Sequence, residues 1–251
     1  MRALPFAFAR EIPGLKAFTT LRGDNLGLNT DEAPARVIES RQGLFGSQGI
    51  ALNSTVFMRQ VHGQGMARVG SQERGRGSLD LADAIPDCDS ILSADPGVFL
   101  CVGHADCLAL LLVDPVKRAV GAAHCGWRGA SLRLATQLLQ RMETELGTRP
   151  ADVYAGLSVC LGPCHLELSE NEHRIFSPQP GSADFCSPLR DGHFFLDLWK
   201  QTERQLLDLG LAPEKIEVQD ECTACHPERF YSFRREQGHC GRMLSVIGFD
   251  R

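Results

Sequence analysis

The chain has 251 residues, of which 43% are hydrophobic and 23% charged, and a formal net charge of -5 at pH 7. These fractions are those of an ordinary soluble protein, and no stretch approaches the length of a membrane span. The acidic balance argues against a nucleic-acid partner and against a role at a membrane surface. We expect one domain over residues 1–251 and a cytoplasmic location, because the start of the chain does not resemble a signal peptide.

The first half of the chain is predicted to hold short strands separated by turn-rich loops. Apolar runs indicate strands within 14–20 and at 56–58, and helical spacing indicates a helix over 35–44. Another short strand begins at Cys88 and Asp89, and an Asp-Pro-Gly turn follows at 95–97.

The second half contains the two most convincing helices. The stretch 132–146 is amphipathic, with Ser131 suited to the N-cap and Gly147 to the position after the last turn. A second helix is predicted over 195–209, and strands over 153–159, 216–218 and 243–247, with an aromatic strand at 230–235. The Pro- and Ser-rich stretch 177–192 is interpreted as a long surface loop.

A Cys and a His stand at the ends of two predicted strands, 108–113 and 119–123, which an Asp-Pro turn connects. If these strands pair antiparallel, Cys107 and His124 meet at one end of the sheet. Two chemistries fit such a pair, a metal site and a thiolate nucleophile activated by a base. The simpler alternative is a buried Cys that packs as a small hydrophobe beside a structural His.

Other candidate ligands carry weaker signals. His62 follows the predicted strand 56–58 at the point where the chain leaves the strand, and a single His there favours a structural role. Cys222-Thr-Ala-Cys225-His226 spells the attachment signature of a c-type haem, which we reject because nothing in the sequence indicates export. A zinc knuckle there would need a second ligand pair, and only His239 and Cys240 are near in sequence. We therefore expect Cys222 and Cys225 to be dispensable for activity, and Cys125 as well. All ten cysteines are expected to be reduced thiols.

Taken together, the motifs resemble the YfiH-like, laccase-domain family, also called the polyphenol oxidase or purine nucleoside phosphorylase family. The resemblance covers nearly the whole chain. It rests on Arg59-Gln-Val-His62-Gly63, His104-Ala-Asp-Cys107, Ala123-His124-Cys-Gly-Trp-Arg128-Gly129, Leu161-Gly-Pro-Cys164, Cys222-Thr, Phe230-Tyr-Ser-Phe-Arg-Arg235 and Gly241-Arg242.

The resemblance implies a mixed α/β (α+β) domain of packed sheets flanked by helices. It also implies that His62, Cys107 and His124 form the catalytic site as zinc ligands, with a fourth position open for water or substrate. Asp106 is the candidate hydrogen-bond acceptor that would orient the imidazoles behind the metal. The sequence departs from the family pattern at Cys125, where Ala is usual, in the loop with Arg22, and at 88–90.

The implied activity is phosphorolysis of adenosine, inosine and methylthioadenosine, with adenosine deamination as a side activity. A phosphate substrate needs cations, and the candidates are Arg59, Arg128, Arg234, Arg235 and Arg242. The alternatives are an amidase that removes misincorporated L-Ser from cell-wall precursors, a copper-dependent laccase, a metal-free Cys-His hydrolase and a protein with a structural zinc. The sequence argues against laccase chemistry, because blue-copper and multicopper sites need many His ligands. The oligomeric state is left open.

Overall fold

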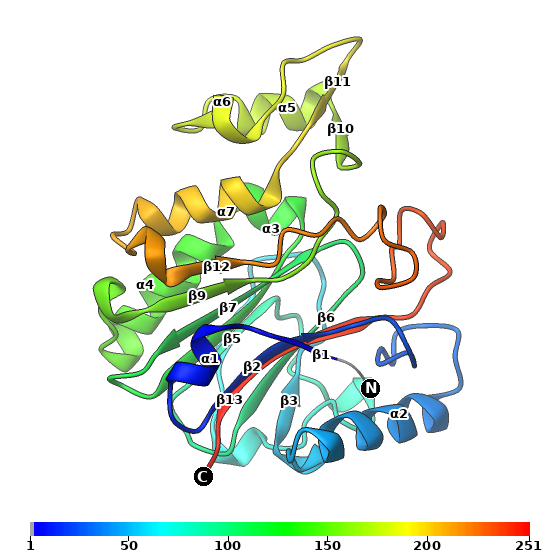
Figure 1. The fold of residues 1–251 in the computed structure, drawn as a ribbon, viewed down its shortest axis with the longest axis vertical. Helices are drawn as coiled ribbons and strands as arrows, with labels where there is room; N and C mark the ends of the chain where they lie inside the picture. The colour runs from blue at the N-terminus through cyan, green and yellow to red at the C-terminus, as the bar shows by residue number, and fades with distance from the viewer. Residues whose placement is uncertain (1–2) are drawn as a thin grey trace.

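Two β-sheets lie face to face in the computed structural model, which describes residues 3–251, and helices cover both outer faces (Figure 1). The five-stranded sheet has the order β1-β2-β13-β6-β3, and the six-stranded sheet has the order β12-β9-β7-β8-β5-β4. Strands β10 and β11 form a separate two-stranded sheet. The strands are β1 Ala3–Pro5, β2 Leu15–Thr20, β3 Thr55–Phe57, β4 Met66–Arg68, β5 Ser90–Ser93, β6 Phe99–His104, β7 Leu108–Asp114, β8 Ala119–Cys125, β9 Tyr154–Leu157, β10 Glu167–Ser169, β11 His193–Phe195, β12 Ile216–Val218 and β13 Met243–Phe249.

The longest helices pack on the outer faces of the two sheets. Side chains of α2 join the core on the outer face of the five-stranded sheet, and those of α4 and α7 join the core on the outer face of the six-stranded sheet. The helices are α1 Phe8–Glu11, α2 Pro34–Ser47, α3 Trp127–Ser131, α4 Leu134–Leu146, α5 Glu170–Phe176, α6 Ser182–Phe185 and α7 Leu198–Leu207. Short 3-10 turns lie at Leu52–Ser54, Ser71–Glu73, Leu81–Asp83, Pro150–Asp152 and Pro213–Lys215. No helix between residues 3 and 251 has the length and apolar character that crossing a bilayer requires.

Strand β7 explains why the central apolar run is continuous. Its alternate side chains Leu108, Leu110 and Leu112 pack toward α4 and α7. The intervening residues Leu111 and Val113 pack between the two sheets. A strand covered on both faces needs apolar residues at every position, so the period of two that marks a half-exposed strand is absent.

The predicted antiparallel pairing at the centre of the chain is confirmed. Strand β7 pairs with β8 in a register that sets Leu108 opposite Cys125 and Ala109 opposite His124. Cys107, which directly precedes β7, therefore lies at the same sheet end as His124.

Helix α4 confirms the predicted helix, with one correction at its start. Gly147 has the left-handed φ of 67°, and its N–H closes the last turn. The predicted N-cap at Ser131 is wrong, because a separate short helix, α3, occupies 127–131. The chain turns at Arg133 with a φ of 57° before α4 begins.

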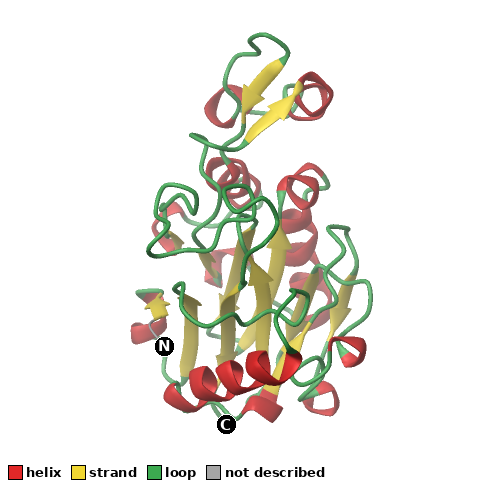
Figure 2. Ribbon diagram, turned by 90° about the vertical axis from the view of Figure 1, so that its right-hand side faces the viewer, coloured by secondary structure: helices red, strands yellow, loops and turns green. Residues whose placement is uncertain are grey.

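Two other segments differ from the sequence prediction. The stretch 167–195, in which 177–192 was expected to be a loop, contains β10, β11, α5 and α6, and it projects from the end of the molecule opposite α2 (Figures 1 and 2). Its Phe176 and Phe194 belong to the core that also contains α7. The aromatic stretch 230–235 was expected to be a strand. It lies instead within 219–242, a segment without helix or strand apart from a single bridge at Cys222.

Candidate metal centre

Three side chains from separate parts of the chain meet at one end of the sheets. One donor atom each of His62, Cys107 and His124 lies within 4.8 Å of the other two. The two imidazole rings are 4.8 Å apart between centroids and inclined at 75°. His62 follows β3, Cys107 precedes β7, and His124 lies near the end of β8, so three strand ends together position the donors.

Asp89, which is fully buried, holds two of the three donors in place. Its Oδ1 lies 2.9 Å from Nδ1 of His124 and accepts the backbone N–H of His62 at 3.0 Å. Its Oδ2 accepts the backbone N–H groups of Val61 and Gly63 at 3.1 and 2.7 Å. These bonds stabilise the left-handed conformation of His62, which has a φ of 59° and would be strained in isolation.

The hydrogen bonds to Asp89 also determine which nitrogen of His124 is free. Burial opposes ionisation of Asp89, but the bonds from His124 and from the backbone outweigh it and lower the pKa of this carboxyl. An ionised carboxylate only accepts hydrogen bonds, so Nδ1 of His124 carries a proton and Nε2 is the nitrogen that could bind a metal.

Cys107 and His124 shift each other's pKa values in opposite directions. Burial alone would raise the pKa of Cys107, but the charge and hydrogen bonds of His124 and His62 lower it to about 6. Burial likewise works against protonation of His124, but the neighbouring Cys107 thiolate and Asp89 raise its pKa to about 9.

The prediction that Asp106 accepts from an imidazole is not met by the structure. Its Oδ1 accepts from the Thr223 hydroxyl at 2.6 Å, and its Oδ2 accepts from the Arg234 backbone N–H at 2.6 Å. Asp106 has a φ of 92°, and this left-handed turn directs its carboxylate toward the C-terminal segment. The carboxylate that contacts an imidazole is therefore that of Asp89 and not that of Asp106.

The three donors open into a cavity of about 380 Å³. Its wall includes the aromatic rings of Trp127 and Phe233. Asp106 is the only carboxylate among the described residues that line it, against three arginines, so the lining is electropositive. The lining residues are Asn29, Gln60, His62, Gly103, His104, Ala105, Asp106, Cys107, His124, Gly126, Trp127, Arg128, Leu161, Leu166, Leu198, Phe233, Arg234 and Arg242.

Three of the five arginines proposed for phosphate line this cavity. Arg128 stacks on Trp127, with Cζ 4.3 Å from the ring centroid. Arg234 donates to the carbonyl of His165 at 3.3 Å, and Arg242 donates to the carbonyl of Cys240 at 2.7 Å. Each of these guanidinium groups has five N–H donors, so donors remain for an anion.

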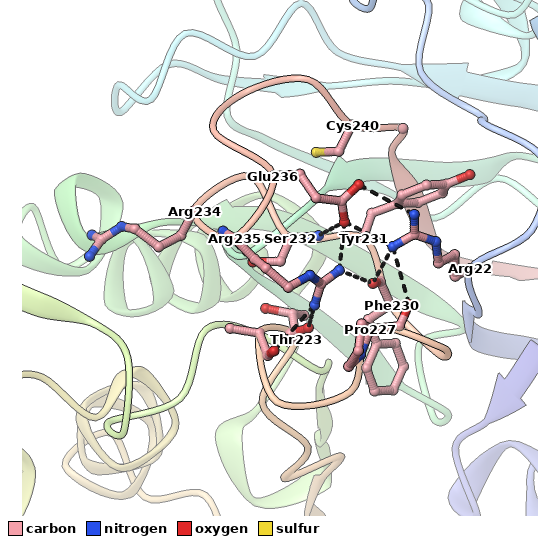
Figure 3. Close-up of polar contacts among 12 residues, drawn as sticks. Arg22, Thr223, Pro227, Phe230, Tyr231, Ser232, Arg234, Arg235, Glu236 and Cys240 are labelled. Carbon is pink, nitrogen blue, oxygen red and sulfur yellow. Dashed lines mark hydrogen bonds and ion pairs between the residues drawn. The ribbon is translucent and has the colours of Figure 1, made fainter.

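The other two arginines lie outside the cavity lining. Arg235 donates to the carbonyls of Thr223 and Phe230 at 2.6 and 2.8 Å and pairs with Glu236, so it holds the C-terminal segment together. Figure 3 shows the Arg234 side chain pointing away from this network. Arg59 is exposed and pairs with Asp87 at 3.0 Å, also away from the cavity. Neither Arg235 nor Arg59 is placed to contact a ligand near the metal centre.

A family model described as multi-copper polyphenol oxidoreductase laccase matches residues 16–250. The chain belongs to this family. It is 32% identical over 225 residues to the purine nucleoside phosphorylase YlmD of Bacillus subtilis (strain 168), an alignment that covers 89% of this chain and 81% of that protein.

Solved structures of family members share the fold. The Bacillus licheniformis hypothetical protein YfiH matches with a TM-score of 0.94 and 26% identity, covering 99% of this chain and 96% of that chain. YlmD from Geobacillus stearothermophilus matches with a TM-score of 0.91 and 30% identity, covering 100% and 97%. The predicted family and the mixed α/β fold are confirmed.

The donor set of this family member fits a metal ion, and Gly126 keeps the space for the ligands open. A Cβ at Gly126 would lie 2.7 Å from Sγ of Cys107 and 3.7 Å from Cδ2 of His62. Cys125, the unusual thiol beside His124, packs instead into the core toward α4 and α7, where burial raises its pKa. Cys125 is not one of the donors that converge at this site.

Asp89 is a site residue that the sequence alone did not predict. The only signal was an acidic residue at the start of a buried strand, where a carboxylate needs partners. A second group of donors, which consists of Cys164, His165, Cys222 and Cys225, was likewise not predicted. Two ligand pairs, Cys164-His165 and the Cys-x-x-Cys at 222–225, were visible in the sequence, but nothing there indicated that they meet.

Proposed function

We propose that this protein is a zinc-dependent purine nucleoside phosphorylase that acts on adenosine, inosine and methylthioadenosine. The observation that carries the proposal is one cavity that combines three metal-ligand donors, two aromatic rings and three arginines. The name of the Bacillus subtilis relative supports it. We also propose that residues 1–251 act as one catalytic domain. Ten free cysteines are consistent with a reducing, cytoplasmic environment.

The cavity lining offers separate partners for the two ends of the substrates. The rings of Trp127 and Phe233 can stack on a purine, which has no charge and two flat faces. Arg128, Arg234 and Arg242 can bind a phosphate, because a negatively charged nucleophile needs cationic partners to hold and orient its oxygen toward C1′.

In the proposed reaction a phosphate oxygen forms a bond to C1′ of the ribose as the bond from C1′ to the purine nitrogen breaks. The purine leaves with the electron pair and takes up a proton from phosphate or solvent. The arginines hold the phosphate in line with C1′, and the aromatic rings hold the base. Bound by His62, Cys107 and His124, zinc would supply Lewis-acid stabilisation of negative charge.

A metal-free Cys-His hydrolase is the second candidate, because one observation favours it. The pKa of Cys107 is lowered to about 6 and that of His124 raised to about 9, as in a thiolate–imidazolium nucleophile. His62 argues for the metal, since a third donor within 4.8 Å has no function in a two-residue nucleophile.

The decisive experiment incubates the zinc-containing protein with adenosine or inosine, with and without phosphate. We expect free base and ribose 1-phosphate only when phosphate is present. Base release unchanged by phosphate would identify a hydrolase, and inosine formed from adenosine would identify the deaminase side activity. Cleavage of an L-Ser-bearing muropeptide precursor without base release would favour the amidase. Phenol oxidation only after copper loading would assign the laccase activity to copper at this same site.

A further inference from the structure

Four donors outside the cavity converge on one point. Cys164 and His165 lie on the turn after β9, and Cys222 and Cys225 lie on the segment after β12. Nδ1 of His165 is 3.2 Å from Sγ of Cys164 and 3.6 Å from Sγ of both Cys222 and Cys225. The sulfurs of Cys164 and Cys225 are 3.6 Å apart, and all four donors lie within 4.8 Å of one another.

We propose that Cys164, His165, Cys222 and Cys225 bind a second zinc ion in a closed, structural site. Zinc takes four tetrahedral ligands in such sites, at about 2.3 Å from sulfur and about 2.0–2.1 Å from nitrogen. Those bond lengths place the sulfurs about 3.8 Å from one another and about 3.6 Å from the nitrogen. The four separations given above, 3.2 to 3.6 Å, are close to these values.

The ligand types distinguish this site from the metal centre in the cavity. Three thiolates and one imidazole complete the coordination shell and leave no position for substrate, as in structural zinc sites. The Cys-x-x-Cys spacing at 222–225 is the spacing usual for one half of such a site. A Cys164–Cys225 disulfide is the competing explanation, but it would leave His165 and Cys222 without a role.

Backbone groups around the cluster support a ligand role for Cys222, which is the buried member of the four. The backbone N–H of Gly162 donates to its sulfur at 3.3 Å, a contact that stabilises a thiolate. A single β-bridge joins Cys160 to Cys222, and the N–H of Thr223 donates to the carbonyl of Cys160 at 2.9 Å. The two halves of the cluster are therefore held side by side.

The consequence of a metal here is the placement of the segment 219–242. This segment lies between β12 and β13 and supplies Phe233, Arg234 and Arg242 to the cavity. Segments of this length without helix or strand are uncommon in compact domains, since little of their backbone is paired. Zinc at Cys222 and Cys225 would fix one end of the segment to the turn after β9.

Three hydrogen bonds connect the cluster to residues that line the cavity. Thr223, between the two cysteine ligands, donates to Asp106, the residue before Cys107. Arg234 donates from its side chain to the carbonyl of His165 and from its backbone to Asp106. The second zinc would thus position Arg234 without contacting substrate.

The test counts zinc in protein purified anaerobically without added metal. We expect about two zinc ions per chain in the wild type and about one in Cys225→Ser and in His165→Ala. His62→Ala should also retain about one, and the His62→Ala/Cys225→Ser double variant close to none. His226→Ala, beside Cys225 but outside the cluster, and Cys186→Ser are matched controls that should keep both ions. Unchanged zinc in both Cys225→Ser and His165→Ala would overturn the proposal.

A second measurement uses the wild type and does not depend on a variant folding. Cys164 and Cys225 are exposed, so iodoacetamide should reach them unless a metal holds their sulfurs. We expect both to be protected in the zinc-containing protein and alkylated after chelation, while Cys186 reacts equally in both samples. Equal labelling of Cys164 and Cys225 before and after chelation, or a Cys164–Cys225 disulfide in the anaerobic protein, would contradict the proposal.

Discussion

His124 Nδ1 lies 2.9 Å from Asp89 Oδ1, and this buried contact determines how the imidazole faces the metal centre. The same carboxylate accepts the backbone N–H groups of 61–63, so one residue positions both histidines of the candidate metal centre. Asp89 is a positioning residue that need not contact the metal or substrate.

Asp89→Asn should therefore weaken zinc binding at the cavity by about 10–100-fold, the usual effect of losing the partner that orients a metal ligand. An amide accepts through one oxygen only, so it cannot hold His124 and the three N–H groups as the carboxylate does. Competition with a chelator of known affinity measures the change. Asp114→Asn is the matched control, because Asp114 is equally buried but caps the turn at the far end of β7. Wild-type zinc affinity in Asp89→Asn would show that Asp89 does not position the zinc-binding side chains.

Replacement of any one of His62, Cys107 and His124 by Ala should release the cavity zinc while the fold survives. Two remaining donors do not make a stable zinc site at micromolar metal, since structural and catalytic sites use at least three protein ligands. Metal analysis and circular dichroism of the same samples give the answer. His239→Ala, an exposed histidine outside both clusters, should lose no zinc. Full occupancy in all three ligand variants would defeat the assignment.

Gly126→Ala should reduce zinc occupancy through steric contact alone. The added Cβ would lie 2.7 Å from Sγ of Cys107, which must move, while the backbone φ of -65° suits alanine without strain. Gly43→Ala in α2 meets no atom within 4 Å and should stabilise the protein by about 0.5–1 kcal/mol through helix propensity. Zinc titration and thermal denaturation of both variants separate the two effects. Normal zinc binding in Gly126→Ala would show that Cys107 can shift and still ligate.

The arginines should separate into three classes when each is replaced by Gln. Arg234→Gln and Arg242→Gln should raise the KM for phosphate by about tenfold, equivalent to about 1.4 kcal/mol, because they line the cavity. The main effect of Arg235→Gln should be a lower melting temperature, since the side chain loses its bonds to the carbonyls of Thr223 and Phe230. Arg59→Gln should change neither quantity. Phosphate kinetics and melting curves on all four variants check this division, and a specific rise in KM for Arg59→Gln would contradict it.

Glu236 should make the stability of the protein depend on pH in the acidic range. Burial raises its pKa, but hydrogen bonds from Arg235 and from the N–H of Ser232, with the charge of Arg22, lower it below its ordinary value of 4.5. A carboxyl with a lowered pKa in the folded state stabilises the protein above its unfolded pKa, and this contribution is lost as the pH falls through the folded value.

Glu236→Gln should consequently be less stable than the wild type at pH 7, and the difference should shrink as the pH falls below 4.5. Urea denaturation at a series of pH values measures the difference. Glu228→Gln provides the control, because Glu228 is exposed and pairs with His226 at 3.6 Å. A stability difference for Glu236→Gln that stays constant down to acid pH would exclude the ion pairs as its cause.

Features that depend on neighbours along the chain could be predicted from the amino-acid sequence. Turn residues and apolar runs located β7 and β8, and Gly147 marked the end of α4, because strand period and helix capping are local. Since a two-strand unit with a short turn pairs antiparallel, the sequence was enough to place Cys107 and His124 together.

The meeting of polar groups across long separations depends instead on the tertiary structure. Asp89 contacts a histidine 35 residues away, and Cys222 meets His165 across 57 residues. Arg234 and Arg235 are adjacent, yet one lines the cavity and the other binds the carbonyls of Thr223 and Phe230. Such contacts follow from strand register and from the course of a segment without regular structure, and neither leaves a periodic pattern in the sequence.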